Sequence, residues 1–361
     1  MDLWTPHLNS NRSFWQTPWL NPLNDVVAWN TLLQGVNPLW SLSEVRARVL
    51  AVEWECADVF SLRLKPNRRF KGHLAGQHVA LELEINGVRK IRTFSISNAP
   101  QANGELRLSI KVNPHGTLSK AASQLSKGDV VVLSQAAGEF TGEALDGQAL
   151  LISAGSGITP MMALLESWAA RDTRPDVVLV HSCRRADELI FAKQLQTLVH
   201  QWPELRVHLH YSAADGHLDA ARLTEWVPDL DRREAFLCGP EGFKAWVHAL
   251  YEARGIGPQL KQEHFRQLRF SARPDAERYA VHVGQHASGF SAGNGQSLLE
   301  AAEQSGLKPA YGCRRGICMS CQCKKTSGIV RNQLTQTDSG DSEEWIQLCI
   351  STPLSDLHLE L

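Results

Sequence analysis

The sequence predicts a multidomain chain with three folded units: an antiparallel β-sandwich or barrel, a doubly wound parallel α/β domain and a small α+β domain. Three observations predict it: closely spaced alternating strands near the N-terminus, a strand-then-helix rhythm in the middle, and five cysteines in the last 49 of 361 residues. The expected boundaries are an arm at 1–42, the barrel at 43–145, the α/β domain at 146–265, a linker at 266–278 and the last domain at 279–361.

Composition excludes several classes of protein. Hydrophobic residues make up 43% of the chain and charged residues 21%, with a net charge of −1. This is ordinary globular composition, without the basic field that binds nucleic acid. No apolar run reaches the roughly 18 residues needed to cross a bilayer, and the N-terminus does not resemble a secretory signal. We therefore expect a cytoplasmic protein, which its partner could hold at the inner face of the membrane.

The N-terminal arm is rich in tryptophan and proline. One interpretation is that residues 1–42 pack on the later domains. The other is a docking segment or peripheral membrane association, because tryptophan suits half-wet interfaces. The arm has one arginine and no lysine, so its own attraction to anionic lipid would be weak. Residues 23–36 have helical apolar spacing. The arm holds five of the eleven tryptophans, which are Trp4, Trp15, Trp19, Trp29 and Trp40.

Residues 43–145 alternate apolar and polar side chains in short segments that turn residues separate. Strands at this spacing are typical of an antiparallel sandwich or barrel. Asn-Gly pairs at 86–87 and 103–104 are turn signals between them. Residues 116–125 are expected to form the one short helix. The expected strands are 45–55, 59–66, 78–85, 91–97, 105–112 and 129–135.

Beyond residue 146, buried strands alternate with helices, which predicts a doubly wound domain with a parallel sheet. A charged, proline-containing stretch at 266–278 follows it. A strand at 279–284 and an amphipathic helix at 297–306 then lead to a cysteine-rich loop. In the α/β domain we expect strands at 149–155, 176–182, 206–212 and 234–240, and helices at 159–171, 186–201, 217–227 and 241–255.

The C-terminal cysteines have the spacing of an iron–sulfur site. Cys313, Cys318, Cys321 and Cys349 give C-x4-C-x2-C with a distant fourth cysteine, which is the plant-type spacing for a [2Fe–2S] cluster. Structural zinc is the alternative, but zinc sites usually offer two C-x2-C pairs and this loop has one. Cys323 alternates with Cys321 along an expected strand, and we predict that it is not a ligand.

A glycine loop follows the first strand of the α/β domain. The segment Gly155-Ser156-Gly157-Ile158-Thr159-Pro160 runs from a buried strand into a helix, with Pro160 at the expected first helical position. A helix N-terminus in this context receives a pyrophosphate. The third glycine of the usual dinucleotide fingerprint is absent, so a tight structural turn is the alternative.

Two more strand ends fall where ligands lie in such sheets. Arg184 and Arg185 suit bidentate pairing with a 2′-phosphate; a solvated turn is the alternative. Cys238-Gly239-Pro240 ends another strand at the open edge. Its thiol would act through its size or polarity rather than as a nucleophile, and simple packing is the alternative.

Several motifs, taken in order, resemble the ferredoxin–NADP⁺ reductase-like flavoproteins. Arg92-Thr93-Phe94-Ser95 is similar to the family's Arg-x-(Tyr/Phe)-Ser flavin signature, and Gly116-Thr117-Leu118-Ser119 to its flavin-phosphate turn. The loops at 155–160 and 238–240 resemble its pyridine-nucleotide motifs. Ala75-Gly76-Gln77 and Gly138-Glu139-Phe140 stand where its barrel motifs belong. The last domain resembles the plant-type [2Fe–2S] ferredoxin, a β-grasp fold, of oxygenase reductases, especially those serving fatty-acyl desaturases.

The resemblance implies roles for individual residues. Arg92 would neutralise the flavin phosphate, Phe94 would lie along the isoalloxazine or ribityl, and Ser95 would hydrogen-bond near flavin N5. The catalytic residues would be Ser95, Cys238 and Glu263. Further FAD ligands would be Thr93, Lys111, Gly116, Thr117, Leu118, Ser119 and Phe265. The nucleotide ligands would be Gly155, Gly157, Thr159, Pro160, Arg184, Arg185, Cys238, Gly239 and Pro240.

The function implied is that of an NAD(P)H-dependent oxidoreductase that splits electron pairs. The nicotinamide would give a hydride to FAD, preferred over FMN because of the turn at 116–119, and single electrons would pass through the cluster to a protein partner. Arg184 and Arg185 favour NADPH over NADH. The expected acceptor is a membrane-bound diiron fatty-acyl desaturase or hydroxylase, steered by Arg314 and Arg315 unless these serve only solubility. The alternatives are the reductase of a soluble Rieske dioxygenase or demethylase, and a non-catalytic ferredoxin-type electron carrier.

Overall fold

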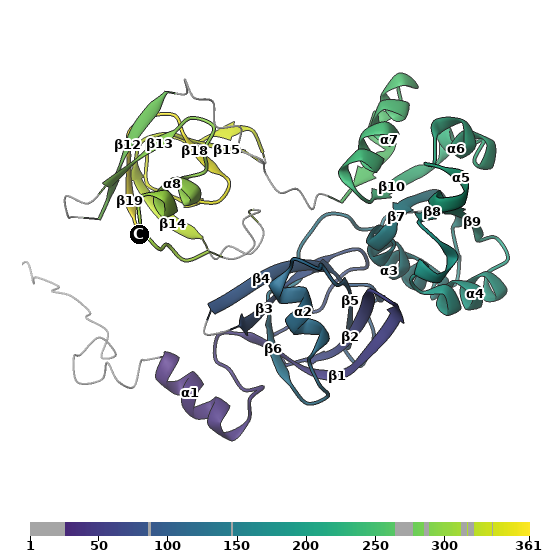
Figure 1. The fold of residues 1–361 in the computed structure, drawn as a ribbon, viewed down its shortest axis with the longest axis horizontal. Coiled ribbons are helices and arrows are strands. Elements are labelled where there is room, and N and C mark those ends of the chain that lie inside the picture. Colours follow the sequence, from purple (N-terminus) through teal and green to yellow (C-terminus); the bar gives the residue numbers. More distant parts are fainter. Residues whose placement is uncertain are drawn as a thin grey trace, which may run out of the picture.

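The computed structural model describes residues 26–85, 88–145, 147–263, 277–284, 289–311, 316, 321–333 and 335–361 (Figure 1). These residues form an antiparallel barrel, a parallel α/β domain and a small C-terminal domain of two sheets, so the predicted fold class is confirmed. Within the described ranges, no helix is both long and apolar enough to cross a bilayer.

The barrel is a six-stranded sheet in the order β4-β3-β6-β1-β2-β5. A bridge between Ile96 and Leu108 links the end of β4 to β5 and closes the sheet on itself. Alternate residues such as Leu62 and Leu81 are fully buried inside it, and α2 covers one end with Leu118. The elements up to this point are α1 (Val26–Val36), β1 (Val45–Cys56), β2 (Val59–Pro66), β3 (His78–Ile85), β4 (Val88–Ser95), β5 (Leu106–Lys111), α2 (Thr117–Ser123) and β6 (Val130–Leu133).

The nucleotide-type domain is a five-stranded parallel sheet in the order β11-β10-β7-β8-β9. Its central strands are apolar on both faces because helices cover both. The elements are β7 (Gln148–Ala154), α3 (Ile158–Ala169), β8 (Asp176–Cys183), α4 (Ala192–Gln201), β9 (Arg206–Tyr211), α5 (Ser212–Asp215), α6 (Ala220–Trp226), β10 (Glu234–Cys238), α7 (Glu241–Ala253) and β11 (Leu260–Gln262).

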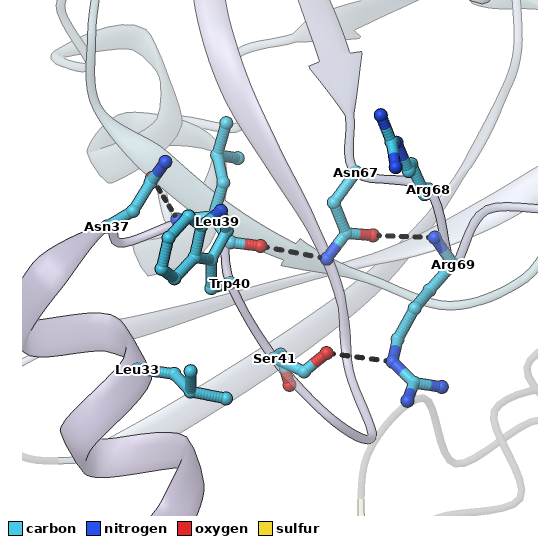
Figure 2. Close-up of a pocket in the computed structure, with 8 residues that line it drawn as sticks. All are labelled: Leu33, Asn37, Leu39, Trp40, Ser41, Asn67, Arg68 and Arg69. Atoms are coloured by element: carbon cyan, nitrogen blue, oxygen red, sulfur yellow. Dashed lines mark hydrogen bonds between the residues drawn. The ribbon is translucent and has the colours of Figure 1, made fainter.

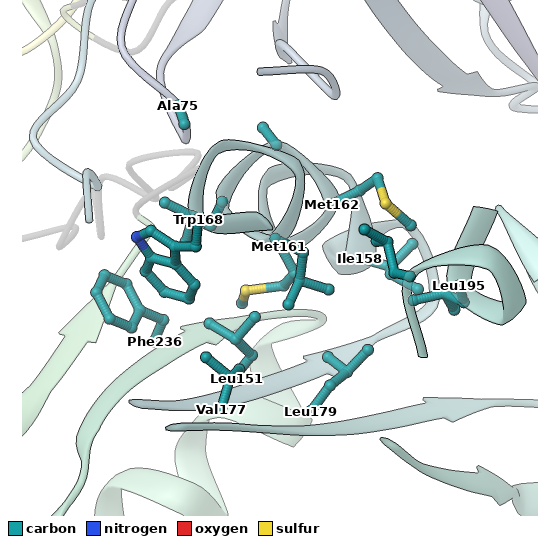
Figure 3. Close-up of a cluster of buried hydrophobic side chains, with 14 of the residues drawn as sticks. Ala75, Leu151, Ile158, Met161, Met162, Trp168, Val177, Leu179, Leu195 and Phe236 are labelled. Atoms are coloured by element: carbon teal, nitrogen blue, oxygen red, sulfur yellow. The ribbon is translucent and has the colours of Figure 1, made fainter. Parts of the chain in front are cut away.

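These two domains share one hydrophobic core. Ala75 and Phe140 of the barrel pack into the same cluster as Leu151, Trp168 and Phe236 of the α/β domain (Figure 3). The Trp168 indole N–H also donates to the carbonyl of Gly142, at 3.0 Å. Because the core is continuous, the strand ends of the two domains are held in a fixed relation to each other.

Two local expectations are wrong. The helix expected at 186–201 begins only at Ala192, because Phe191 is buried and has a left-handed backbone (φ 62°) that no α-helix accommodates. Residues Ala186–Glu188 form a short 3₁₀ turn instead. Pro160 is the third residue of α3 rather than the first, since α3 begins at Ile158 directly after a 3₁₀ turn at Gly155–Gly157.

The C-terminal domain packs α8 on a mixed sheet ordered β13-β12-β19-β14-β17, beside a small sheet β16-β15-β18. Helix α8 begins at a side-chain cap, in which Ser297 Oγ accepts from the N–H of Glu300. The elements are β12 (Arg278–Val283), β13 (Gly289–Gly293), α8 (Leu298–Gln304), β14 (Gln322–Ser327), β15 (Val330–Asn332), β16 (Thr337–Asp338), β17 (Glu344–Gln347), β18 (Ser351–Pro353) and β19 (Leu357–Glu360).

Candidate functional site

A cavity of ≈ 440 Å³ lies where strand ends of the barrel meet strand ends of the α/β domain. The carboxyl ends of β7 and β10 lie at this edge of the parallel sheet, where ligands bind in such folds. The lining residues are Thr93, Phe94, Ser95, Ser109, Lys111, Ala154, Gly155, Ser156, Gly157, Thr159, Cys238, Gly239 and Pro240. Ten of the nineteen residues predicted to bind flavin or nucleotide therefore line this cavity.

Glycine at position 157 is required by close contact between two loops. A Cβ atom there would lie 2.2 Å from the Cys238 carbonyl oxygen and 2.6 Å from its carbon. Gly155 has a φ of 55°, in the left-handed region. The glycine loop therefore folds directly against the Cys238-Gly239 loop, and both form one wall of the cavity.

Three predicted catalytic side chains meet beside this cavity. The Ser95 hydroxyl at the end of β4 donates to the Glu263 carboxylate at 3.2 and 3.3 Å. The Cys238 thiol at the end of β10 donates to Glu263 Oε2 at 3.4 Å. Glu263 directly follows β11, and its backbone N–H donates to the Leu237 carbonyl at 3.2 Å, which fixes it beside β10. The barrel and the α/β domain thus each supply part of one cluster.

Burial controls the electrostatics of this cluster. Glu263 is 4% exposed, and desolvation raises its pKa from 4.5 to about 8, although bonds from Cys238 and Ser95 and the charge of Lys244 act in the opposite direction. Desolvation, followed by the nearby Glu263, raises the pKa of the Cys238 thiol well above its usual range. At neutral pH the thiol therefore keeps its proton and Glu263 is mostly uncharged.

Sequence reasoning missed two neighbours of Glu263. His78 Nδ1 lies 3.9 Å from Glu263 Oε1, and its ring packs under Gly138, where a Cβ would approach it to 2.9 Å. Lys244 is buried on α7 and lies 3.1 Å from Glu241 Oε2. The signal for His78 was its place directly after the Ala75–Gln77 motif, but Lys244 had none, because only the fold brings α7 to this cluster.

On the barrel side of the cavity, a polar side chain (Thr93) lies next to an aromatic one (Phe94). The Thr93 hydroxyl is buried and has no hydrogen-bond partner among the described residues. Phe94 is half-buried next to it. An unpartnered buried hydroxyl beside a ring suits a flat heteroaromatic group with polar edges, which an isoalloxazine has. The residues present therefore fit FAD.

Other predicted flavin ligands lie outside the lining of this cavity or have protein partners. Arg92 is exposed and donates to the Ile91 carbonyl at 2.7 Å. Lys111 lines the cavity but lies 3.0 Å from Asp58 Oδ2. Gly116 caps α2, and the Ser119 hydroxyl accepts from the Asn113 N–H at 3.0 Å. Phe265 lies outside the described residues.

The two arginines predicted to take a 2′-phosphate differ in their surroundings. Arg185 donates to both oxygens of Asp187, each at 3.0 Å, and lies 3.6 Å from Glu188. A guanidinium already paired in this way is a poor phosphate ligand. Arg184 is exposed at the end of β8. Of this pair, Arg184 is the better candidate.

A second contact between barrel and α/β domain centres on Arg107. Its guanidinium lies 2.8 Å from Glu166 Oε1 on α3, and its Cζ lies 4.7 Å from the centroid of the Phe191 ring. Glu166 Oε2 also accepts from the Ala99 N–H at 3.1 Å. Phe191, whose backbone is left-handed, thus places its ring against the barrel just before α4 begins.

The cysteine site is only partly within the described residues. Cys313, Cys318, Arg314 and Arg315 lie outside them. Cys321 and Cys349 are buried, and the Gly316 N–H donates to Cys349 Sγ at 3.3 Å, as cluster thiolates require of nearby amides. Gln347 donates to the Gly316 carbonyl at 2.8 Å and supports this loop. Cys323 is buried in β14, where its thiol faces the Lys324 carbonyl at 3.7 Å.

A flavin-type barrel and a nucleotide-type sheet that share a core, followed by a ferredoxin-type domain, define an electron-transfer flavoprotein. Comparison with known families agrees along the chain. Residues 47–141 match the oxidoreductase FAD-binding domain, 151–249 the oxidoreductase NAD-binding domain, and 281–354 the 2Fe-2S iron-sulfur cluster binding domain.

Relatives extend over nearly the whole chain. It is 30% identical over 331 residues to the NADPH oxidoreductase of Mycobacterium tuberculosis, covering 90% of this chain and 86% of that protein. The chain belongs to this family of NAD(P)H-dependent iron–sulfur flavoprotein reductases, and its cofactors are FAD, a [2Fe–2S] cluster and NAD(P)H.

Two further comparisons concern oxygenase reductases. The chain is 28% identical over 325 residues to the glycine betaine monooxygenase reductase subunit of Chromohalobacter salexigens, covering 79% of this chain and 86% of that one. Its fold is similar to that of phthalate dioxygenase reductase, with a TM-score of 0.60, 22% identity, and coverage of 88% of this chain and 98% of that one. The expected resemblance to ferredoxin–NADP⁺ reductase-like flavoproteins with a C-terminal [2Fe–2S] domain, as in oxygenase reductases, is confirmed.

Proposed function

We propose that this chain is the reductase component of an oxygenase system and takes its electrons from NADPH. The observation that carries the proposal is the cluster of Ser95, Cys238 and Glu263, which joins flavin and nicotinamide domains at one cavity. The ferredoxin-type domain in the same chain gives the electrons an exit. A monooxygenase reductase subunit among the relatives supports an oxygenase as acceptor.

Ser95, Cys238 and Glu263 would hold and move the proton that remains from the transferred hydride once its two electrons have been passed on singly. FAD, when bound, accepts the hydride and releases electrons singly, which the cluster domain accepts one at a time. Glu263 is buried and carries a proton at neutral pH, and the Ser95 hydroxyl lies between it and the cavity. Ser95 therefore relays a proton between the cavity and Glu263. The protonated Cys238 thiol fills the nicotinamide wall and excludes water.

Substitution of a cysteine predicted to bind the [2Fe–2S] cluster separates reduction of the flavin from transfer of its electrons to the acceptor. Cys321→Ser should abolish NADPH-driven reduction of cytochrome c or of the protein acceptor, and leave ferricyanide reduction by the flavin largely intact. Cys323→Ser is the matched control, since the neighbouring thiol is predicted not to bind iron and should support both reactions. Loss of both activities in the Cys321 variant, with flavin still bound, would contradict this order of electron flow.

Metal and flavin content separate the alternatives. The proposal requires iron, acid-labile sulfide and a flavin absorbance band in the purified chain. Zinc without iron would mean a structural zinc site, and a chain without flavin or turnover would be a carrier only. FMN in place of FAD would correct the flavin but not the pathway.

The choice of nucleotide rests on Arg184. If it binds a 2′-phosphate, Arg184→Ala should lower kcat/KM for NADPH about tenfold or more and leave NADH nearly unchanged, as expected for loss of a charge-assisted bond. Arg185→Ala is the control, because Asp187 already occupies that guanidinium. An unchanged NADPH/NADH ratio in the Arg184 variant contradicts the preference.

For the acceptor we propose a membrane-bound diiron fatty-acyl desaturase or hydroxylase, and the alternative is a soluble Rieske dioxygenase or demethylase. Reconstitution of turnover with purified members of each class separates them. Cross-reduction of a Rieske oxygenase at a rate equal to or above that of the desaturase would favour the alternative.

A further inference from the structure

Residues 29–42 expose an apolar surface beside the barrel. Five of the eleven exposed large hydrophobic side chains in the described structure fall between positions 29 and 42, and they are Trp29, Leu32, Val36, Trp40 and Leu42. Leu32 is 65% exposed and Val36 76% exposed. Trp29, Leu32 and Val36 are spaced i, i+3 and i+7, so they share one face of α1. No residue from 26 to 43 carries a charge.

Arginines of the barrel border this surface. A groove of ≈ 580 Å³ is lined by Leu33, Leu39 and Trp40 on the arm side and by Arg68 and Arg69 on the barrel side (Figure 2). Both arginines are exposed. The sequence had suggested weak attraction to anionic lipid because the arm itself is nearly uncharged. In the folded protein, Arg68 and Arg69 in the turn after β2 add positive charge beside the uncharged arm.

The surface is fixed to the barrel rather than loosely tethered. The Asn67 amide donates to the Leu39 carbonyl at 3.0 Å and the Glu44 carbonyl at 3.2 Å, and Arg69 Nε donates to the Ser41 carbonyl at 2.8 Å. On α1, the Asn30 side chain accepts from the Leu42 N–H at 2.7 Å. These bonds hold the segment from Leu39 to Glu44, and with it α1, against the turn that carries Arg68 and Arg69.

We propose that this surface, defined by α1, Trp40 and Leu42 with Arg68 and Arg69, docks the protein on an anionic phospholipid bilayer. An uncharged helix face with tryptophans suits the boundary between head groups and acyl chains, and arginines at its border suit lipid phosphates. A protein partner would need carboxylates opposite the arginines and an apolar pocket for α1, whereas a bilayer supplies both chemistries along one plane. The docking is independent of the proposed redox chain, and it would bring the reductase to an acceptor in the membrane.

The test is vesicle co-sedimentation of the full-length holoprotein. We expect binding to phosphatidylcholine vesicles containing phosphatidylglycerol, much weaker binding to pure phosphatidylcholine, and loss of binding at high salt. Arg68→Glu with Arg69→Glu should weaken binding to the anionic vesicles by about tenfold or more, since each cation near such a surface contributes severalfold. Trp29→Ser with Leu32→Ser and Val36→Ser should weaken it by a similar factor.

A matched control and a soluble readout keep the outcome clear. Trp54→Ser removes a tryptophan that is 56% exposed on β1 and should bind vesicles like the unmodified protein. All variants should keep ferricyanide reductase activity, so a redox failure and a docking failure are distinguishable. The proposal is overturned if the unmodified protein does not bind the anionic vesicles, if both multiple variants bind as well as it does, or if the variants instead abolish a dimer seen in light scattering.

Discussion

Glutamine in place of Glu263 should stabilise the folded chain at neutral and alkaline pH and leave its stability unchanged in acid. Folding raises the pKa of the Glu263 carboxyl from 4.5 to about 8. Between these two pH values the folded state keeps the carboxyl proton and the unfolded state loses it. Below pH 4.5 the carboxyl is protonated in both states, and its burial does not lower the free energy of unfolding. Stability then falls as the pH rises from 4.5 to 8. The pKa difference corresponds to about 5 kcal/mol above pH 8 and about 3 kcal/mol at pH 7.

Glutamine tests this because it keeps an acceptor oxygen for Ser95 without the charge. Urea unfolding of the holoprotein at pH 5, 7 and 9 should give a difference in unfolding free energy that grows with pH in favour of Glu263→Gln. Glu225→Gln, an exposed position on α6, is the control and should show no such trend. If the difference is the same at all three pH values, or largest at pH 5, Glu263 is charged at neutral pH and the reasoning about its burial is wrong.

Three further outcomes follow from contacts described above. Arg107→Ala should slow flavin reduction by NADPH several-fold in stopped-flow measurements, with little effect on electron transfer from the photoreduced flavin to the [2Fe–2S] cluster. A double-mutant cycle with Glu166→Gln should give a coupling energy of about 1–3 kcal/mol. Additive effects of the two substitutions would mean that this pair does not hold the domains together. Gly157→Ala should raise KM for the nucleotide because its Cβ would lie 2.2 Å from the Cys238 carbonyl oxygen, whereas Gly242→Ala, with nothing within 4 Å, should leave it unchanged. Glu263→Gln should also remove any decrease in the rate of flavin reduction above pH 8. If the rate of the variant still decreases above pH 8, another group causes that pH dependence.

Periodicity and strand ends predict much of this molecule. Alternating segments mark the barrel strands, and buried runs mark the parallel strands. Cys238 is found at an expected strand end, whereas Ser95 and Glu263 are found only through the resemblance to a flavoprotein family, since the strand before Glu263 is not expected from the sequence. Their mutual contact is a property of the packed domains, and the raised pKa of Glu263 exists only once the barrel covers it.

The errors arise where another domain overrides local preference. The apolar spacing at 186–201 fits a helix, but Phe191 leaves helical geometry to lie against Arg107. From the sequence Arg185 is a candidate ligand for a 2′-phosphate, because its ion pair with Asp187 forms only in the folded 3₁₀ turn at Ala186–Glu188. Lys244 looks like a solvated helix residue until α7 packs beside Glu263.

The position of Glu263 also limits how far the start of the third domain can lie from the α/β domain. Hydrogen bonds from Ser95 and Cys238 anchor it, and the next described residue after it is Glu277, at the start of the third domain. An extended chain over that interval spans at most about 50 Å. The iron–sulfur domain therefore follows in the chain soon after the proposed hydride-transfer site. Because the flavin-binding and iron–sulfur domains belong to one chain, electron transfer between them is intramolecular, and the rate of that step should not depend on enzyme dilution.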